Sequence, residues 1–270
     1  MPASLNAVVA QRIEVASGLI ILRVAPEGWE LPEFQAGQFA VLGLPGTAQR
    51  VLMSDPDKPE LKPDKMIRRA YSIASASIQS EYLEFYITLV RSGELTPRLF
   101  ALQPGDKLYL GPKITGMFTL NQVPQGSDLV LVGTGTGLAP YMSMLRSEIE
   151  CHSEVRTAVL LGARHSWDLG YRGELIAMQR FCPSFHYFPV ISRPEEEVTP
   201  WSGHTGYVQD LWQDGTITEA WGRAPSPDRT HILLCGNPAM IEGMLTTLEA
   251  AGYTEHTRKQ PGQIHVEKYW

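Results

Sequence analysis

The sequence is poor in cysteine and has no long apolar run. Its three cysteines, Cys151, Cys182 and Cys235, are far apart and form no Cys-x-x-Cys pair. They are too few for a four-cysteine zinc or iron–sulfur site. We therefore expect a reduced, cytoplasmic protein. The longest apolar runs, such as LVLVG from Leu129, are far shorter than the roughly 20 residues of a membrane helix. The first residues lack the features of a secretory signal, so we expect none.

The sequence also lacks an excess of basic residues. Residues 1–122 carry 12 Lys and Arg against 12 Asp and Glu, and residues 123–270 carry 11 against 17, which gives a net charge of -6. A nucleic-acid-binding protein usually has a broad basic face. The charge therefore argues against that class.

Residues 1–122 are predicted to form short β-strands. Apolar runs such as LIILRVAP and YLEFYITLV are rich in β-branched and aromatic residues and are separated by turn residues, a pattern typical of a barrel or sandwich. A short helix is predicted at TPRLFAL, with Thr96 as its N-cap and Pro97 at its first position. We interpret the stretch Pro45–Lys65, with its four prolines, as a surface excursion that touches none of the motifs below.

Residues 123–270 have a different pattern, and QVPQGSD is the natural linker before them. Four apolar runs, DLVLVG, TAVLLGA, FHYFPVIS and THILLCG, alternate with predicted helices near residues 139–150, 173–181, 206–214 and 238–251. This alternation indicates a parallel sheet covered on both faces. Ligands of such sheets bind beyond the carboxyl ends of the strands. The segments to search are therefore GTGTGLAP, GARHSW, ISRPEE and CGNPAM.

Individually, the candidate motifs have ordinary explanations. GTGTGLAP (Gly133–Pro140) could bring backbone close to a phosphate at a helix start, but it departs from G-x-G-x-x-G and could be a tight turn. In RRAYSIAS, Arg69 and Tyr71 share a strand face and could hold a phosphate and a ring, or simply be exposed. Cys235 in CGNP could be a small buried residue rather than a reactive thiol.

Taken together and in this order, the motifs resemble the ferredoxin/flavodoxin–NADP reductase family, most closely the bacterial branch whose chains end in Tyr-Trp. R-x-Y-S at Arg69–Ser72, GELTPRL, GTGTGLAPY, CGNP and the aromatic C-terminus carry the resemblance, which extends from AGQF to the last residue. It implies a six-stranded antiparallel FAD-binding β barrel (residues 1–122) followed by a parallel-sheet NADP(H)-binding α/β domain (residues 123–270).

The resemblance also implies roles for residues in the barrel. Arg69 would hold the FAD pyrophosphate, Tyr71 would stack on the isoalloxazine, and Ser72 would lie near flavin N5, which accepts hydride. Thr96 would direct backbone N–H groups at the pyrophosphate. The other FAD contacts that the resemblance implies on this side are Ala70, Thr88, Val90, Gly93 and Leu95.

In the second domain, the resemblance implies a site for NADP. The glycine turn, with Thr134, Gly135, Thr136 and Gly137, would take the diphosphate and the nicotinamide side. Cys235 and Glu267 would border the nicotinamide, and Ser72, Cys235, Glu267 and Tyr269 form the implied catalytic set.

Selection of the 2′-phosphate would fall to two arginines. Arg164 and Arg193 would read the phosphate, but Tyr207 stands where a further arginine often occurs in the family, and the acidic run PEEE follows Arg193. We still expect NADPH to be preferred over NADH.

The final stretch HVEKYW places two large rings at the chain end, where chains usually fray. A core plug, a landing site for a partner or a bound flat ligand would each explain it. By the resemblance, Tyr269 would cover the flavin face opposite Tyr71, and Trp270 would pack on the FAD adenine. The alternative is a terminal strand that plugs the domain interface.

The predicted function is electron transfer between NADP(H) and ferredoxin or flavodoxin through FAD, with hydride passing to flavin N5 and electrons leaving singly. We expect a cytoplasmic monomer with no metal. An NADH-preferring flavin or oxygenase reductase component, and a flavin-binding electron-transfer subunit without NADP turnover, are the alternatives. An acidic carrier would dock on basic groups, for which the candidates are Arg91, Arg98, Lys113, Arg258, Lys259 and Lys268.

Overall fold

A computed structural model describes residues 5–57, 65–151 and 154–268, and the chain forms two compact units. The first unit comprises Met1–Thr119 with Ala139–Glu148, and the second comprises Leu120–Leu138 with Ile149–Trp270. Each unit contains one six-stranded sheet. The first sheet is antiparallel and the second is parallel, which confirms the predicted fold class.

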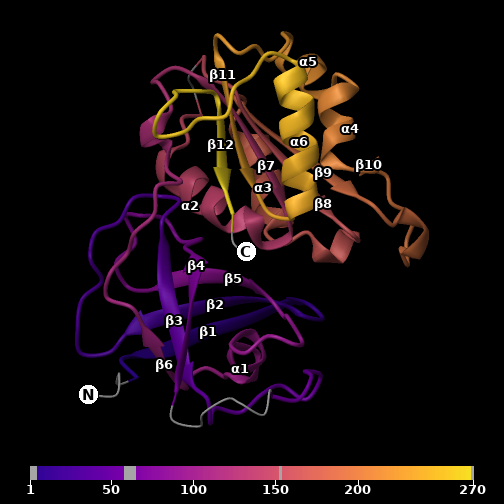
Figure 1. The fold of residues 1–270 in the computed structure, drawn as a ribbon. Helices are drawn as coiled ribbons and strands as arrows, with labels where there is room; N and C mark the ends of the chain where they lie inside the picture. The colour runs from indigo at the N-terminus through magenta and orange to yellow at the C-terminus, as the bar shows by residue number, and fades with distance from the viewer. Residues whose placement is uncertain (1–4, 58–64, 152–153, 269–270) are drawn as a thin grey trace. The chain divides into compact units, whose positions relative to one another are not determined.

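An antiparallel barrel forms the first unit (Figure 1). Its strands run in the order β4-β3-β6-β1-β2-β5, and a bridge between Ile73 and Phe85 connects the two ends of that order. The strands are β1 (Ala7–Ala16), β2 (Leu19–Pro26), β3 (Phe39–Pro45), β4 (Met66–Ser72), β5 (Leu83–Thr88) and β6 (Lys107–Leu110).

The barrel interior is filled by alternate residues of its strands. Ile20, Leu22 and Val24 of β2 are fully buried, as the period of two along a strand requires. Helix α1 (Thr96–Ala101) adds Leu99 and Phe100 to the same apolar cluster. The packing of α1 on the barrel core therefore fixes the loop that precedes this helix.

A parallel sheet forms the core of the second unit, with the strand order β10-β9-β8-β7-β11-β12. Residues Val130 and Val132 of β7 and Ile232 and Leu234 of β11 are fully buried, which explains the near-continuous apolar runs of these two adjacent strands. The strands are β7 (Asp128–Thr134), β8 (Thr157–Ala163), β9 (Phe185–Ile191), β10 (His204–Thr205), β11 (Thr230–Cys235) and β12 (Ile264–Glu267).

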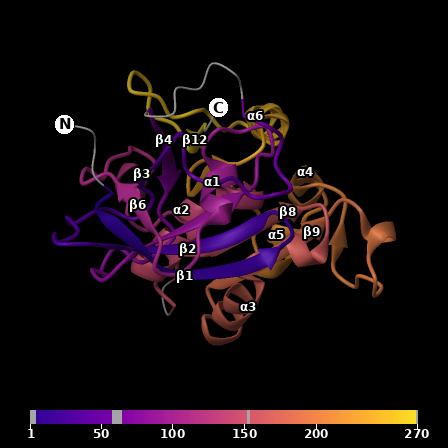
Figure 2. The same ribbon diagram turned by 90° about the horizontal axis from the view of Figure 1, so that it is seen from below.

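Helices cover both faces of this sheet. Buried residues of α4 (Val208–Gln213), α5 (Thr216–Trp221) and α6 (Pro238–Ala250) pack against one face. Figure 2 shows α3 (Arg172–Phe181) and α6 on opposite sides of β8 and β9. Four short 3-10 turns are η1 (Leu120–Gln122), η2 (Gly135–Leu138), η3 (Ser166–Asp168) and η4 (Pro194–Glu196).

Helix α2 (Ala139–Glu148) belongs to the first unit by its contacts. Its Arg146 donates hydrogen bonds to the carbonyl oxygen of Ala74 and to the carboxylate of Glu84, each at 2.7 Å. Glu84 also accepts from Arg23 at 2.7 Å. Because the Glu84 side chain is only 2% exposed, these two arginines supply the charge that its burial requires.

The cysteines do not follow the sequence expectation. Cys151 and Cys182 form a disulfide, with their Cα atoms 4.5 Å apart, and Cys235 is in no disulfide. The expectation of a fully reduced chain is therefore wrong for this structure. The two cysteines are 31 residues apart in sequence. Cys182 is the C-cap of α3, and the hydroxyl of Ser184 just after it donates to the carbonyl oxygen of Glu150, next to Cys151, at 2.9 Å.

Within the described residues, none of the helices is long and apolar enough to cross a membrane.

Candidate functional site

Strand β4 carries the R-x-Y-S motif in the first unit. The Arg69 side chain is 56% exposed, the Tyr71 ring is half-buried, and Ser72 is buried. Burial raises the pKa of Tyr71, so the phenol stays neutral and its ring is available for stacking. Arg69 donates to the carboxylate of Glu94 at 2.8 Å. This ion pair connects the motif on β4 to the loop before α1.

The loop before α1 is closed by Thr96, although not in the predicted way. Leu95, and not Thr96, is the N-cap of α1 and makes no side-chain capping bond. The Thr96 hydroxyl instead accepts from the N–H of Val90 at 3.0 Å and donates to its carbonyl oxygen at 3.1 Å. The prediction of a Thr96 cap was therefore wrong. Thr96 thus connects the two ends of the loop. Gly93 lies within the loop, and its N–H donates to the carbonyl oxygen of Val90.

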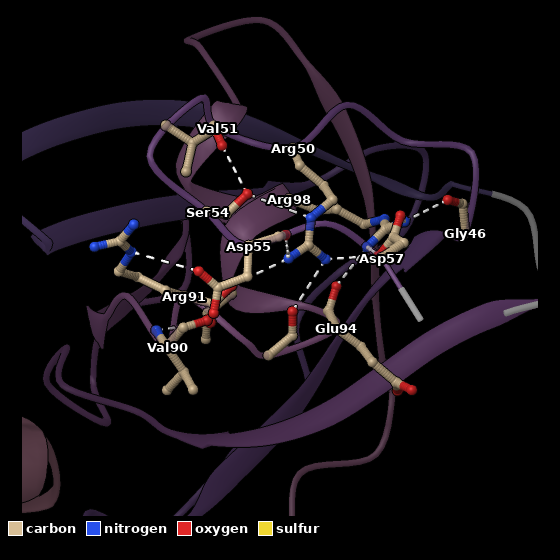
Figure 3. A network of polar contacts seen from close by, with 12 residues as sticks. Gly46, Arg50, Val51, Ser54, Asp55, Asp57, Val90, Arg91, Glu94 and Arg98 are labelled. Atoms are coloured by element: carbon tan, nitrogen blue, oxygen red, sulfur yellow. Dashed lines mark hydrogen bonds and ion pairs between the residues drawn. The ribbon is translucent and has the colours of Figure 1, made fainter. Parts of the chain in front are cut away.

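The excursion Pro45–Lys65 contacts this loop, contrary to the sequence interpretation (Figure 3). Arg50 donates to the carbonyl oxygens of Gly93 and Arg91, each at 3.1 Å, and to the carboxylate of Asp57 at 2.7 Å. The backbone also joins the two segments, since the Asp55 N–H bonds to the carbonyl oxygen of Arg91. The described part of the excursion is thus a brace for the motif GELTPRL.

Arg98 is the buried centre of this brace. Its side chain is 1% exposed and donates to the carbonyl oxygens of Glu94 and Gly46 and to both carboxylate oxygens of Asp57. The hydrogen bond from Arg98 is the main cause that lowers the pKa of Asp57, so the carboxylate stays ionised. The sequence had placed Arg98 among the docking cations. That prediction was wrong, because the guanidinium is buried and both of its terminal nitrogens donate hydrogen bonds within the protein.

A surface cavity of about 380 Å³ adjoins Arg69. The Arg68 guanidinium lies 4.3 Å from the centre of the Tyr109 ring, and Lys113 adds a third positive charge. Sequence reasoning missed Arg68 and Tyr109, although the doubled arginine in MIRRAYS was a signal. The cavity is lined by Val41, Arg68, Arg69, Ala70, Tyr109, Gly111, Pro112 and Lys113.

Two of the remaining predicted barrel contacts lie on β5 and at the helix start. Thr88 is exposed at the end of β5, while Leu95 is buried in the barrel cluster. Leu95 can therefore contact a ligand only through its backbone, whereas the Thr88 side chain is open to solvent.

In the second unit, the predicted glycine turn lies where the strand order reverses, between β7 and β11. Ligands of parallel sheets bind at such a switch point. The turn is pressed against the CGNP loop, because a Cβ on Gly137 would collide with the carbonyl group of Cys235, and a Cβ on Gly236 with Thr134. The Thr134 hydroxyl accepts from the Asn237 N–H at 2.8 Å. Only glycines allow the two loops to approach so closely.

Gly135 supplies the backbone conformation of this turn, with φ of +53°, and Thr136 follows it in η2. The α2 helix then begins with Ala139 and Pro140, which lacks an N–H. A glycine-lined turn that leads into a helix suits a diphosphate, since the backbone can approach it closely.

Cys235 and Glu267 meet at the same edge of the sheet. They are register partners on the parallel strands β11 and β12, and the Cys235 thiol donates to the Glu267 carboxylate at 3.9 Å. Cys235 is fully buried, whereas Glu267 is partly exposed. The structure therefore brings together two predicted residues that are 32 positions apart.

Arg164 and Arg193 follow adjacent strands, β8 and β9. The backbone N–H of Arg193 bonds to the carbonyl oxygen of Arg164 at 3.0 Å, and both side chains are exposed. The two guanidinium groups therefore start from neighbouring points at the carboxyl edge of the sheet. Tyr207 is the N-cap of α4 and is 67% exposed, and Gly206 before it bonds to Ile191 at the end of β9.

Two predicted residues, Tyr269 and Trp270, lie outside the described residues, so their roles stay predictions. The first residues of the same stretch, 265–267, belong to the edge strand β12 (Ile264–Glu267). Ser72 belongs to the first unit, and Cys235 and Glu267 belong to the second. The predicted catalytic residues that the structure describes are therefore divided between the two units.

Comparison with known proteins identifies what these features resemble. A family model described as an oxidoreductase NAD-binding domain matches residues 131–245. The chain is 31% identical over 239 residues to the flavodoxin/ferredoxin–NADP reductase of Escherichia coli (strain K12), and the match covers 88% of each chain. It is 30% identical over 238 residues to the flavodoxin/ferredoxin–NADP reductase of Buchnera aphidicola subsp. Baizongia pistaciae, again over 88% of each chain.

A solved structure gives the same result. The chain matches the ferredoxin NADP+ reductase from Neisseria gonorrhoeae, crystallised with bound FAD and NADP, with a TM-score of 0.80 and 26% identity over 98% of each chain. Together with the two curated relatives, this match confirms the resemblance found in the sequence. The chain belongs to the flavodoxin/ferredoxin–NADP reductase family.

Proposed function

We propose that this protein is a flavoenzyme that moves electrons between NADP(H) and a ferredoxin or flavodoxin through FAD. One observation carries the proposal. The carboxyl edge of the parallel sheet gathers the Cys235–Glu267 pair, the glycine turn at Gly137 and the arginines Arg164 and Arg193. The glycine turn lets the backbone approach a diphosphate closely, and the two arginines offer cations for a 2′-phosphate. The Cys235–Glu267 pair would border the nicotinamide.

The barrel residues fit the other cofactor, FAD. Arg69 offers an exposed guanidinium for a pyrophosphate, and Tyr71 offers a neutral ring for a flavin face. The loop that includes Val90, Gly93 and Thr96 is held in place by its own hydrogen bonds and by the Arg50 and Arg98 brace. FAD, when bound, accepts hydride at N5 and releases electrons one at a time.

Roles follow for the protein's own groups in the chemical step. Glu267 accepts a hydrogen bond from the Cys235 thiol, and the pair would border the nicotinamide ring. Ser72, buried at the end of β4, would orient the flavin edge by a hydrogen bond. Tyr269 would cover the flavin face that the nicotinamide must reach, and Trp270 would pack on the adenine.

A carrier protein would dock through positive charge. Ferredoxins and flavodoxins are typically acidic, so basic side chains would steer their association although the chain is acidic overall. Without the buried Arg98, the candidates are Arg91, Lys113, Arg258, Lys259 and Lys268, which are exposed.

Domain limits, cellular location and oligomeric state complete the proposal. We assign residues 1–122 to FAD binding and residues 123–270 to NADP(H) binding, and we propose a monomer. We expected a cytoplasmic location because the cysteines are few and form no Cys-x-x-Cys pair, but the disulfide between Cys151 and Cys182 weighs against it, since cytoplasmic thiols are usually kept reduced.

The catalytic proposal is tested by coupling NADPH oxidation to a purified flavodoxin or ferredoxin. We expect carrier reduction that requires the protein and slows as salt rises from low to physiological ionic strength. A flavin-loaded protein that NADPH reduces but that passes no electrons to either carrier would favour a flavin reductase. A protein that binds FAD but is not reduced by NADPH would favour an electron-transfer subunit without NADP turnover.

A further inference from the structure

An acidic turn lies against the cations at the end of β8 and β9. The turn is η4 with Glu197, and it directly follows Arg193. The Glu196 carboxylate lies 3.3 Å from Nη1 of Arg193 and 2.7 Å from Nε2 of His165. The Glu196 carboxylate therefore contacts Arg193, one of the two arginines assigned to the 2′-phosphate. It also contacts His165, which directly follows the other arginine, Arg164.

Neighbouring bonds hold this turn in place. Glu197 accepts from both the backbone N–H and the hydroxyl of Ser166, each at 2.6 Å. Ser166 is the first residue of η3, which follows β8. These hydrogen bonds join the acidic turn after β9 to the turn after β8, and they fix the backbone position of Glu196.

His165 is held as firmly as the turn. Its ring stacks on Trp167 with centroids 4.4 Å apart, its Nδ1 lies 3.1 Å from the carboxylate of Asp168, and its side chain is only 12% exposed. The hydrogen bond with Glu196 is the main cause that raises the pKa of His165, and the Asp168 carboxylate adds to it. The imidazole can thus provide a positive charge at this sheet edge in addition to Arg164 and Arg193.

The two nucleotides make opposite demands on Glu196. A 2′-phosphate brings negative charge to Arg193, so the carboxylate must leave the cations before the phosphate can pair with them. A ribose that keeps its 2′-hydroxyl makes no such demand, because an ionised carboxylate accepts a hydrogen bond from a hydroxyl. A carboxylate in this position therefore works against the phosphorylated nucleotide and favours the other.

We propose that Glu196 is a specificity-determining residue that narrows the preference of this protein for NADP(H) over NAD(H), because its carboxylate competes with the 2′-phosphate for Arg193 and His165. The inference rests on the proposed function, since it takes the arginines to be the phosphate site. Tyr207 stands where a further arginine often occurs in the family. The site therefore has one cation fewer for the 2′-phosphate, which also narrows the preference for NADP(H).

The test compares two small ligands that differ at the 2′-position. Adenosine 2′,5′-bisphosphate and adenosine 5′-monophosphate are titrated by calorimetry at constant pH and ionic strength into the wild type, Glu196→Gln and Glu196→Ala. Glu195→Gln is the matched control, because it removes one exposed carboxylate from the same turn. No flavin chemistry enters this readout.

We expect both Glu196 variants to raise the ratio of bisphosphate to monophosphate affinity about tenfold, the size of one charge-assisted contact. The gain should come from tighter bisphosphate binding, with monophosphate binding unchanged or weaker. Glu195→Gln should change the ratio less than about twofold, because a charge without direct contact is screened. If the Glu196 variants match Glu195→Gln, the inference is wrong.

The wild type separates this inference from the proposed function. A wild type that prefers the bisphosphate, with no effect of Glu196, contradicts the inference alone. A wild type without preference, whose Glu196 variants acquire one, supports it. Equal binding of both ligands by the wild type and all variants would show that the arginines do not read the phosphate, so the NADP site and the inference would fail together.

Discussion

Cys235 and Glu267 face each other across the parallel pair β11 and β12, with the thiol sulfur 3.9 Å from a carboxylate oxygen. The pair lies one strand away from the switch point between β7 and β11, next to the loop of Gly236 and Asn237. A thiol–carboxylate contact at the carboxyl edge of a parallel sheet, where such sheets bind their ligands, favours a role in the reaction over a purely structural one.

Replacing the Glu267 carboxylate by an amide tests this role. Glu267→Gln keeps the size of the side chain, and we expect NADPH to reduce the flavin about tenfold more slowly or worse. The rate is measured by anaerobic stopped-flow absorbance. Glu249→Gln, an exposed change on α6, is the control and should leave the rate unchanged. Equal rates in the two variants would remove Glu267 from the mechanism.

Arg193 is predicted to read the 2′-phosphate. Arg193→Ala should raise KM for NADPH about tenfold and leave KM for NADH nearly unchanged, because the lost contact is charge-assisted and exists only with the phosphate. Steady-state kinetics with both nucleotides provide the measurement, and Arg180→Ala on α3 is a charge-matched control. Similar losses with NADPH and NADH would show that Arg193 contacts another part of the nucleotide.

Asp57 is predicted to support FAD binding through the brace of Arg50 and Arg98. Asp57→Asn leaves the buried Arg98 guanidinium without its charge partner, so we expect the free energy of unfolding to fall by about 1–3 kcal/mol, a value reduced because the Asp57 side chain is 35% exposed. FAD should also dissociate more readily, which flavin fluorescence after ultrafiltration measures. Asp55→Asn, whose carboxylate lies 3.8 Å from Arg91 on the exposed surface, should change neither. A lower stability with unchanged FAD affinity would limit the brace to folding.

Acid should destabilise the protein through His265. Burial is the main cause that lowers the pKa of His265 from 6.5 to about 4, and the neighbouring His256 and His231 lower it further. Because the unfolded chain binds the proton first, stability is complete above pH 6.5 and is lost as pH falls towards 4, by up to about 3 kcal/mol. Urea unfolding across this range measures the loss. His265→Gln should flatten the curve relative to the wild type, and parallel curves would assign the acid sensitivity to other groups.

The cysteines give a direct chemical test of the fold of the second unit. Denatured under non-reducing conditions, the protein should show one reactive thiol per chain, that of Cys235, and three after reduction. Reduction should lower the free energy of unfolding by about 3–4 kcal/mol in the chain-entropy account of a disulfide across 31 residues. Three thiols without reductant would restore the expectation of a reduced protein.

Periodic patterns predicted the architecture because they report burial. The alternating runs of β1 to β6 and the continuous apolar runs of β7, β8, β9 and β11 each matched their sheets. Helices α2, α3, α4 and α6 also lie where the sequence placed them. The two-residue strand β10 is too short to produce a period and was not predicted. The helix α5 was not predicted either.

Contacts between distant segments were beyond sequence reasoning. Arg98 looked like a surface cation because nothing near it in sequence shows that Asp57 and Gly46 cover it. Thr96 had the residue type of an N-cap, but its hydroxyl bonds to Val90 across the loop instead. The effect of Glu196 on the phosphate site likewise depends on a turn folding back onto His165.

The measurement that tests the central claim most directly is an anaerobic titration of the purified protein with NADPH and with NADH. We expect a yellow protein with noncovalent FAD, whose long-wavelength flavin absorbance is bleached by NADPH at lower concentrations than by NADH. A colourless protein that takes up no FAD, or bound FAD that NADPH does not bleach, would contradict the account.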